Sequence, residues 1–202
     1  MPRVLLTAFG PYDVWQDNAS WLVLEQLTRT YSGDARLTTR RYPVDYDTLR
    51  DRLASDLKTR FDAVLCLGQS PGSAVVQLER FAINVAGAGP QTNGQCRPLV
   101  TDGPAAYRSG LPLEKWRGAL TERGVPCEVS HHAGDYLCNA AMYYAHYWNE
   151  QNGHDCQAVL AHLPLTPQQV IASGRALPSL PLAVSVAAVE LMIASVGQPA
   201  LA

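Results

Sequence analysis

Charged residues are scarce in this chain, and neither sign dominates. Asp, Glu, Lys and Arg make up 17% of the 202 residues, and the formal net charge is -2 at pH 7. The chain therefore lacks the basic surface that nucleic acids and anionic membranes attract, and we expect neither as a partner. A hydrophobic content of 47% predicts a globular protein with a substantial core. So little charge also indicates that some surface is buried against another subunit, as in a homo-oligomer.

Long apolar runs and paired cysteines are absent as well. No apolar run reaches the roughly 18 residues of a membrane-spanning helix. Residues 1–9 are too short and too strand-like for a signal peptide. The five cysteines are scattered, without CxxC spacing, at Cys66, Cys96, Cys127, Cys138 and Cys156. An odd, scattered set is typical of reduced thiols in the cytoplasm, where we expect the protein to reside.

The motifs of several common enzyme classes are missing too. There is no G-x-S-x-G, which disfavours a serine hydrolase. The turn at 68–72 lacks the Lys and Ser/Thr of a phosphate-binding loop. The spacing of the Cys and His residues between 131 and 156 matches no paired zinc-ligand pattern. The sequence therefore indicates neither a zinc site nor a phosphate-binding loop.

Apolar runs of strand length alternate with helical patterns along the chain. Strands are predicted at 3–9, 36–44, 62–67, 126–130 and 157–162, with an extended segment at 75–85. Helices are predicted from a cap at Asn18 or Ser20 to about residue 31, from an Asp45 cap to 57, and at 113–123, 136–148 and 183–196. Several strands are continuously apolar, which is typical of strands covered on both faces. The pattern predicts one α/β domain over residues 1–202: a three-layer α/β/α arrangement, with an open, twisted, largely parallel mixed sheet between helices.

Cys138 is the strongest candidate for a chemical role. It follows a short turn and lies at the start of the predicted helix 136–148, where the helix dipole and unpaired N–H groups favour a thiolate. His162 ends an apolar strand, and an imidazole can accept a thiol proton and later protonate an amine leaving group. The alternative for His162 is a core histidine bonded to a backbone carbonyl. A cysteine and a histidine in these positions indicate a nucleophile with its base.

Glu79 is the candidate for the third group of such a site. It either orients the imidazole by accepting its N–H, or it lies at the surface, in an ion pair with Arg80 or at a solvated strand position, and the residue pattern leaves these open. In open α/β sheets, ligand sites form beyond the carboxyl ends of strands. Phe9, Gln69 and His162 come at or just after such ends, and so does the turn before the candidate cysteine. We expect one edge of the sheet to collect them.

Six segments of the chain match a known family in order and spacing. They are Thr-Ala-Phe-Gly-Pro-Tyr at 7–12, Leu-Gly-Gln at 67–69, Glu-Arg-Phe-Ala-Ile-Asn at 79–84, Ala-Gly-Asp-Tyr-Leu-Cys-Asn at 133–139, and His-Leu-Pro at 162–164 with Pro-Gln-Gln at 167–169. With them the chain resembles pyroglutamyl peptidase I, a family of cysteine peptidases that remove an N-terminal pyroglutamyl residue. Each segment is a weak signal by itself, but together they are specific and extend over essentially the whole chain.

The resemblance implies a role for each of the three candidate groups. Cys138 would be the nucleophile, His162 the general base and acid, and Glu79 the carboxylate that orients the imidazole. The substrates would be peptides with an N-terminal pyroglutamate, cleaved through a thioester intermediate without cofactor or metal.

The resemblance also implies a substrate pocket. Phe9 and Tyr12 would form its apolar walls, Gln69 would hydrogen-bond the lactam, and Tyr136 and Leu137 would line the opposite side. Pyroglutamate is small, neutral and cyclic, so apolar walls with a few polar groups suit it. Discrimination against proline would come from pairing the ring carbonyl, since a buried polar group left unpaired costs roughly 1–3 kcal/mol.

The chain departs from the family's usual sequence near the site. Pro-Gly-Ser at 71–73 replaces Gly-Gly-Arg, Gly89 replaces an arginine, and His131-His132 replace Asn-Thr. Asp135 replaces a small hydroxyl residue, and an acid there either disfavours ionisation of the thiol or caps the helix. These departures leave a second hypothesis open, a weakly active or inactive member that binds a cyclic amide. An enzyme like a nucleoside phosphorylase is disfavoured because no basic phosphate-binding group is placed near the strand ends.

Overall fold

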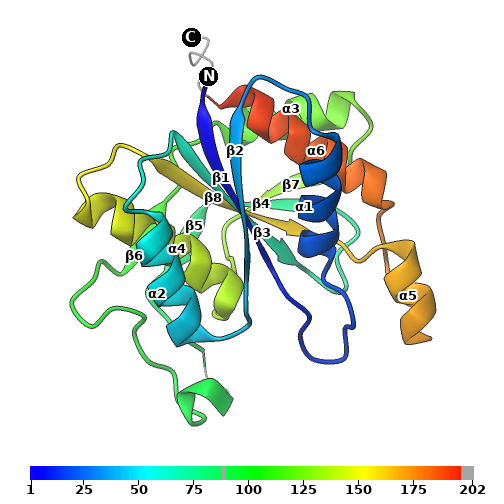
Figure 1. Ribbon diagram of the computed structural model, residues 1–202. Coiled ribbons are helices and arrows are strands. Elements are labelled where there is room, and N and C mark those ends of the chain that lie inside the picture. Colours follow the sequence, from blue (N-terminus) through cyan, green and yellow to red (C-terminus); the bar gives the residue numbers. More distant parts are fainter. Residues whose placement is uncertain (88–89, 197–202) are drawn as a thin grey trace.

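The computed structural model describes residues 1–87 and 90–196. Within them, six strands form a central sheet in the order β2-β1-β3-β8-β4-β7 (Figure 1). Their bounds are β1 Arg3–Phe9, β2 Arg36–Tyr42, β3 Ala63–Gln69, β4 Val76–Glu79, β7 Cys127–Ser130 and β8 Gln157–Leu163. β2, β1, β3 and β8 are parallel, β4 runs antiparallel to β8, and β7 is parallel to β4. The predicted mixed, largely parallel sheet is confirmed.

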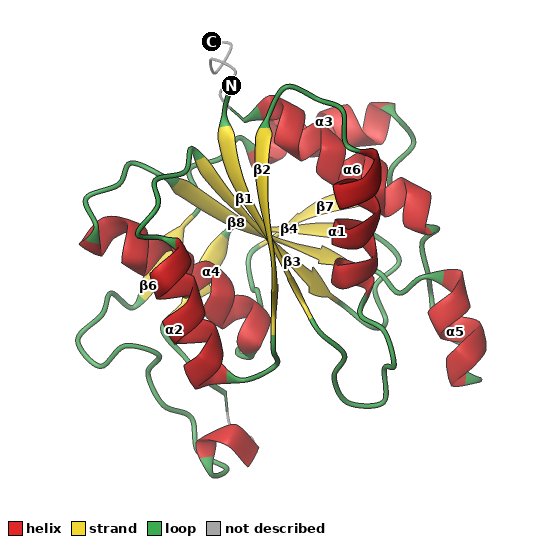
Figure 2. Ribbon diagram, viewed as in Figure 1, coloured by secondary structure: helices red, strands yellow, loops and turns green. Residues whose placement is uncertain are grey.

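Helices cover both faces of this sheet (Figures 1 and 2). One face carries α1 (Ala19–Thr30), α3 (Leu113–Glu122) and α6 (Leu182–Ser195), and the other carries α2 (Tyr46–Asp56) and α4 (Leu137–Gln151). In β3, Leu65 packs in the core under the first group of helices and Val64 in the core under the second, because side chains alternate across a strand. Since both faces are covered, the strand is continuously apolar.

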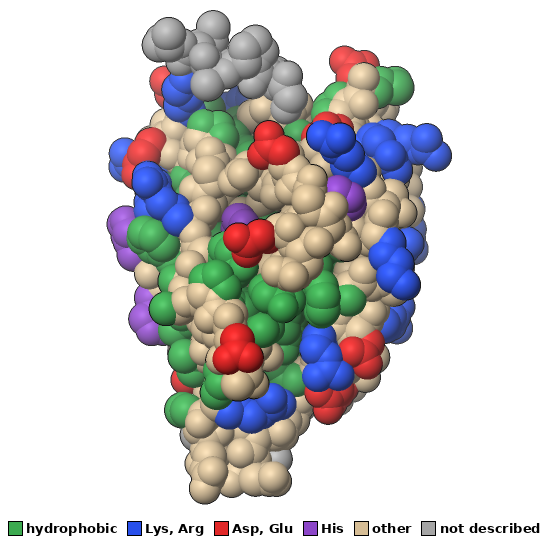
Figure 3. All heavy atoms as spheres, turned by 90° about the vertical axis from the view of Figure 1, so that its left-hand side faces the viewer, with side chains coloured by type: hydrophobic (Ala, Val, Ile, Leu, Met, Phe, Trp, Pro, Cys, Tyr) green, Lys and Arg blue, Asp and Glu red, His purple; other side chains and the backbone are tan. Residues whose placement is uncertain are grey.

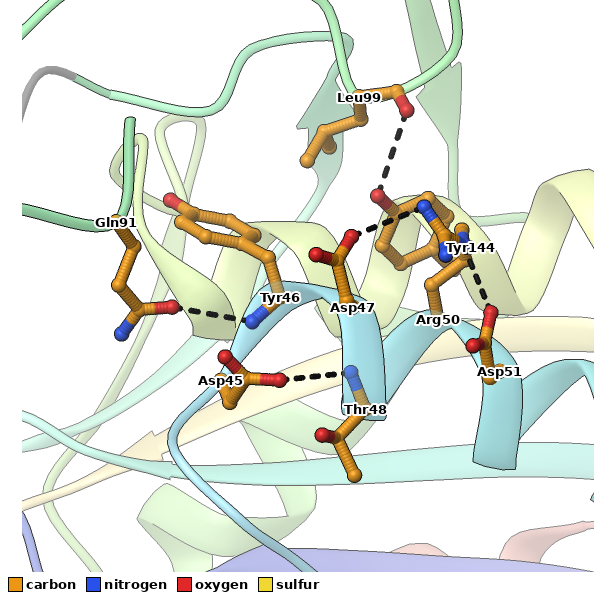
Figure 4. Close-up of polar contacts among 9 residues, drawn as sticks. All are labelled: Asp45, Tyr46, Asp47, Thr48, Arg50, Asp51, Gln91, Leu99 and Tyr144. Carbon is orange, nitrogen blue, oxygen red and sulfur yellow. Dashed lines mark hydrogen bonds and ion pairs between the residues drawn. The ribbon is translucent and has the colours of Figure 1, made fainter. Parts of the chain in front are cut away.

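Local capping sets where the helices begin. Of the two predicted caps of α1, Asn18 is the N-cap, and its side chain accepts from the Ser20 N–H. Asp45 caps α2 as predicted, with its Oδ1 accepting from the Thr48 N–H at 2.8 Å (Figure 4). α4 begins at Leu137, one residue later than predicted.

The predicted extended segment 75–85 contains two strands that belong to different sheets. β4 lies in the central sheet, whereas β5 (Phe81–Ile83) pairs antiparallel with β6 (Ala106–Arg108) in a separate two-stranded sheet. Arg80 lies between them, and its N–H donates to the Ser130 carbonyl at 2.8 Å. No local signal marks this break, because it depends on which strands pair. A further helix that was not predicted, α5 (Pro167–Ser173), follows β8.

The polar stretch after β5 carries a short 3-10 helix, Pro90–Thr92. Gln91 ties this helix to its surroundings. Its Oε1 accepts from the Tyr46 N–H at 3.1 Å (Figure 4), and its Nε2 donates to the Val44 carbonyl and the Tyr136 hydroxyl at 3.0 Å each. The prediction about Gly89 concerns a position outside the described residues. None of the helices in the described residues is both long and apolar enough to cross a bilayer.

Candidate active site

A cavity of about 340 Å³ opens at the edge of the sheet, where β1, β3 and β8 end. All eight predicted site residues line it: Phe9, Tyr12, Gln69, Glu79, Tyr136, Leu137, Cys138 and His162. Glu79 reaches the cavity from the opposite strand direction to Phe9, Gln69 and His162, because β4 runs antiparallel to β8. It lies opposite Leu160, two residues inward from His162 along β8. This register buries the carboxylate beneath the imidazole.

Cys138 is the second residue of α4, and its sulfur lies against Gly68 of β3. The N-cap residue of this helix, Tyr136, makes no side-chain cap hydrogen bond, so the first backbone N–H groups of α4 are not taken up by a capping side chain there. A Cβ placed on Gly68 would lie 2.7 Å from Cys138 Sγ and 3.2 Å from His162 Nε2. The thiol and the imidazole therefore meet over a position where the strand has room only for a hydrogen atom.

His162 lies between the thiol and the carboxylate. Its Nδ1 is 2.8 Å from Glu79 Oε1, and its ring also hydrogen-bonds with Cys138. Burial by itself lowers the pKa of His162, but the hydrogen bonds and electrostatic interactions with Cys138 and Glu79 outweigh burial and raise it to about 10. These two neighbours therefore favour the protonated form of the imidazole.

The surface ion pair considered for Glu79 is wrong. Glu79 is only 1% exposed, and Arg80 pairs instead with Glu114, at 2.7 Å between Arg80 Nη2 and Glu114 Oε1. Glu79, the last residue of β4, faces His162, while Arg80, just beyond the end of the strand, reaches Glu114 at the start of α3.

Gln69 and two aromatic residues form one wall of the cavity. Gln69 Oε1 accepts from the Ala19 N–H at 2.6 Å. Its Nε2 has no partner of standard hydrogen-bond geometry among the described residues, yet it is near enough to the Tyr12 hydroxyl to influence it. Burial raises the pKa of Tyr12 and the contact with Gln69 offsets part of that rise, with a net pKa of about 12. Phe9, 3% exposed, adds apolar surface.

The turn before α4 forms the opposite wall. Leu137 is buried, whereas Tyr136 is 42% exposed, and its ring meets Tyr46 edge-on with the centroids 5.8 Å apart. Asp135 does not cap α4, so that alternative is wrong. Its side chain lies over Gly87, where an added Cβ would be 2.5 Å from Asp135 Cγ, and its backbone carbonyl accepts from the Gly87 N–H at 2.7 Å.

Two buried amides beside the site were not singled out by the sequence. Asn139 Oδ1 accepts from the Ile83 N–H at 2.8 Å, and Asn139 Nδ2 donates to the Ile83 carbonyl at 2.9 Å, which ties the start of α4 to β5. Gln169, on α5, donates from Nε2 to Gln69 Oε1 at 2.7 Å. Both residues lie in the matching segments, but no pattern shows which polar residue of a segment is buried.

The histidines at 131 and 132 have separate surroundings. His132 lines the cavity, and its Nδ1 accepts from the Gly134 N–H at 2.9 Å. The ring of His131 lies near Phe81, with the centroids 6.1 Å apart. In the part of the chain that the structure describes, no three His, Cys, Asp or Glu side chains gather as a group that could hold a metal ion.

A thiol at a helix start, an imidazole and a buried carboxylate in one cavity are the groups that enzymes with a cysteine nucleophile use. Comparison with known proteins narrows this class. The family model described as pyroglutamyl peptidase matches residues 2–198. The chain belongs to the pyroglutamyl peptidase family.

Individual relatives agree with this assignment. The pyrrolidone-carboxylate peptidase of Clavibacter michiganensis subsp. michiganensis is 34% identical over 87% of this chain and 84% of its own length. That of Erwinia tasmaniensis is 33% identical over 96% and 92%. Among solved structures, the pyrrolidone carboxyl peptidase of Fervidobacterium islandicum has a TM-score of 0.90 at 31% identity and covers 96% of this chain and 98% of that one. That of Thermococcus litoralis has a TM-score of 0.89 at 28% identity, with 97% and 93% covered. The predicted family and fold class are confirmed.

Proposed function

We propose that this chain hydrolyses the bond after an N-terminal pyroglutamyl residue of peptides, with Cys138 as nucleophile, His162 as acid and base, and Glu79 as the carboxylate that orients His162. The observation that carries the proposal is the contact of His162 with both other groups in one cavity: 2.8 Å from Nδ1 to Glu79 Oε1, and a hydrogen bond with the Cys138 thiol. The family membership supports the same reaction.

The proposed reaction has two steps. The Cys138 sulfur attacks the pyroglutamyl carbonyl carbon, and backbone N–H groups at the start of α4 stabilise the oxyanion that forms. Protonated His162 gives a proton to the departing peptide amine as the C–N bond breaks and a thioester forms. The neutral imidazole then takes a proton from water, the hydroxide attacks the thioester, and pyroglutamate leaves as the sulfur recovers its negative charge.

The walls of the cavity suit a neutral five-membered lactam. We propose that Phe9, Tyr12, Tyr136 and Leu137 contact the apolar part of the ring and that Gln69 hydrogen-bonds its amide. The Nε2 of Gln69 supports this role, because it has no partner of standard hydrogen-bond geometry among the described residues and only the Tyr12 hydroxyl nearby, so a ligand acceptor can pair with it.

We further propose that residues 1–202 act as one domain and that copies of the chain associate in the cytoplasm. All five cysteines are free, which suits a reducing compartment. Hydrophobic side chains gather at the centre of the face that carries α2 and α4, with charged side chains around them (Figure 3), which suits a contact between copies. Analytical ultracentrifugation tests the association, and a monomer at every concentration would contradict it.

Substitution of the nucleophile tests the proposed reaction. Cys138→Ser should abolish release of the fluorescent amine from pyroglutamyl aminomethylcoumarin, whereas Cys96→Ser, at an exposed thiol, should leave it unchanged. The wild-type protein should prefer the pyroglutamyl to the prolyl amide, and iodoacetamide should inactivate it by alkylating Cys138. Turnover retained by Cys138→Ser would remove Cys138 from the nucleophile's role. A wild-type protein that binds the lactam without releasing amine would indicate the inactive member considered above.

A further inference from the structure

Gln169 is a buried amide that does not line the cavity, yet it hydrogen-bonds Gln69, which does. It lies on α5 and is 7% exposed. Its Nε2 donates to Gln69 Oε1 at 2.7 Å and to the Asp17 carbonyl at 2.9 Å. Its Oε1 accepts from the Thr166 N–H at 2.9 Å. Every hydrogen of this amide group is used.

Two backbone donors determine how both amides are turned. The Thr166 N–H can only donate, so the Gln169 atom that faces it is the oxygen, and the Gln169 amide nitrogen faces Gln69. The Ala19 N–H can also only donate, so the Gln69 atom that it meets is likewise an oxygen. The two assignments are independent, and they agree: Gln69 Oε1 accepts from Gln169 and from the start of α1.

The consequence for Gln69 is that its oxygen is fully occupied on the side away from the cavity. Its Nε2 is left at the cavity without a partner of standard geometry among the described residues. If Gln69 turned by half a rotation, its amide hydrogens would face two donors, and its oxygen would face the cavity. Gln169 and the Ala19 N–H thus make the cavity wall a hydrogen-bond donor.

We propose that Gln169 is a positioning residue for substrate recognition, which holds the Gln69 amide in the orientation that donates an N–H to the ring carbonyl of the substrate. This inference rests on the proposed function, since that function supplies the lactam ring. The ring carbonyl separates a pyroglutamyl from a prolyl residue, so Gln169 contributes to specificity without touching the substrate.

The Gln169 side chain also caps the start of α5 and bonds to the loop before α1. The side chain of Thr166 and that of Gln169 form the capping box of α5, so the same amide that begins the helix reaches Gln69. Through the Asp17 carbonyl it also holds the loop that carries Tyr12. A single side chain therefore links α5 to two segments that line the cavity, the end of β3 and the loop that carries Tyr12.

The test compares one substitution at two neighbouring glutamines. Gln169→Glu replaces the donor with an acceptor and should turn the Gln69 amide, whereas Gln168→Glu makes the same change at an exposed position of α5. Gln169→Met removes the donor at nearly the same volume, and serves if the buried carboxylate prevents folding. Two properties are measured: the kinetics on pyroglutamyl aminomethylcoumarin, and the protection of Cys138 from iodoacetamide by pyrrolidone, the bare lactam ring.

Both Gln169 variants should raise KM and the pyrrolidone concentration for half-protection by about 10- to 100-fold, the usual effect of losing a hydrogen bond to a buried group. Because this contact is made before and during the reaction, kcat should be unchanged. The unprotected rate of labelling should be unchanged too, and Gln168→Glu should behave as the wild type.

Two results would overturn the inference, and a third would overturn the proposed function instead. Folded Gln169 variants that bind pyrrolidone as the wild type does would overturn it. Slower labelling of Cys138 in both variants would also overturn it, because Gln169 would then act on the thiol rather than on Gln69. If the wild type released no amine at all, the proposed function would fail, and the protection by pyrrolidone would still show whether Gln169 controls lactam binding.

Discussion

Gly68 is the position where the smallest change should have the largest effect on activity. Its backbone is ordinary extended strand, so an alanine there meets no conformational strain. The added methyl group would, however, lie 2.7 Å from Cys138 Sγ and 2.9 Å from His162 Cδ2. β3 cannot shift to make room, because it is paired with β1 on one side and β8 on the other. The thiol and the imidazole must move instead.

The size of that movement sets the expected loss. Non-bonded heavy atoms are comfortable at about 3.5 Å or more, so the sulfur at 2.7 Å must retreat by about 0.8 Å. A misplacement of about 1 Å in a catalytic group costs on the order of 100-fold in rate, which corresponds to about 2.7 kcal/mol of transition-state stabilisation. We expect Gly68→Ala to lower kcat/KM for a pyroglutamyl amide by about that factor, with a smaller effect on KM.

The matched control is Gly118→Ala. Gly118 lies inside α3, and an added Cβ would have no heavy atom within 4 Å. Alanine is favoured over glycine in a helix by about 1 kcal/mol, so this variant should unfold at a slightly higher temperature and keep full activity. Steady-state kinetics of the two variants measure kcat/KM, and thermal unfolding shows whether each variant is folded. A Gly68→Ala variant with wild-type kcat/KM would refute the placement of the thiol and the imidazole over this glycine.

Two further predictions concern Glu79 and Asn139. Glu79→Gln removes a negative charge that helps to raise the pKa of His162 to about 10, so the imidazole should lose its proton at lower pH and the alkaline limb of the kcat/KM profile should move to lower pH. A shift to higher pH, or none, would contradict the proposed pairing. Asn139→Ala leaves the Ile83 N–H and carbonyl without their side-chain partner in a buried place, and it should lower the free energy of unfolding by about 2–4 kcal/mol. Urea denaturation measures this free energy. A decrease no larger than that of ordinary surface substitutions would show that the contacts of Asn139 are not formed.

Much of the fold was predictable because it depends on local patterns. The five predicted strands and the extended segment all contain strands, and the caps at Asn18 and Asp45 start helices where expected. The departures occur where pairing decides the outcome. The break at Arg80 arises because β4 pairs with β8 and β7, while β5 pairs with β6. α5 is too short for its period to be recognised beside the prolines that surround it.

The candidate site was predictable in its members, but not in its geometry. Cys138 was singled out because a helix start can be recognised from the residues around it. Glu79 was not distinguishable from a surface carboxylate, since its burial depends on β4 running antiparallel to β8. Its partner His162 is 83 residues away in the chain. Family resemblance, rather than periodicity, singled out Glu79.

The amino-acid sequence by itself determined which segments become strands and helices, and that a thiol would stand at a helix start near several strand ends. Hydrophobic period, capping residues and turn residues act within a few positions, so they can be recognised without knowing the rest of the chain. The tertiary structure alone decided that Glu79 would be buried against His162. It also decided that the thiol and the imidazole would meet over Gly68, which has no side chain, and that Gln169 would hydrogen-bond the amide of Gln69, 100 residues away. These contacts depend on the order and direction of paired strands, which no local pattern encodes.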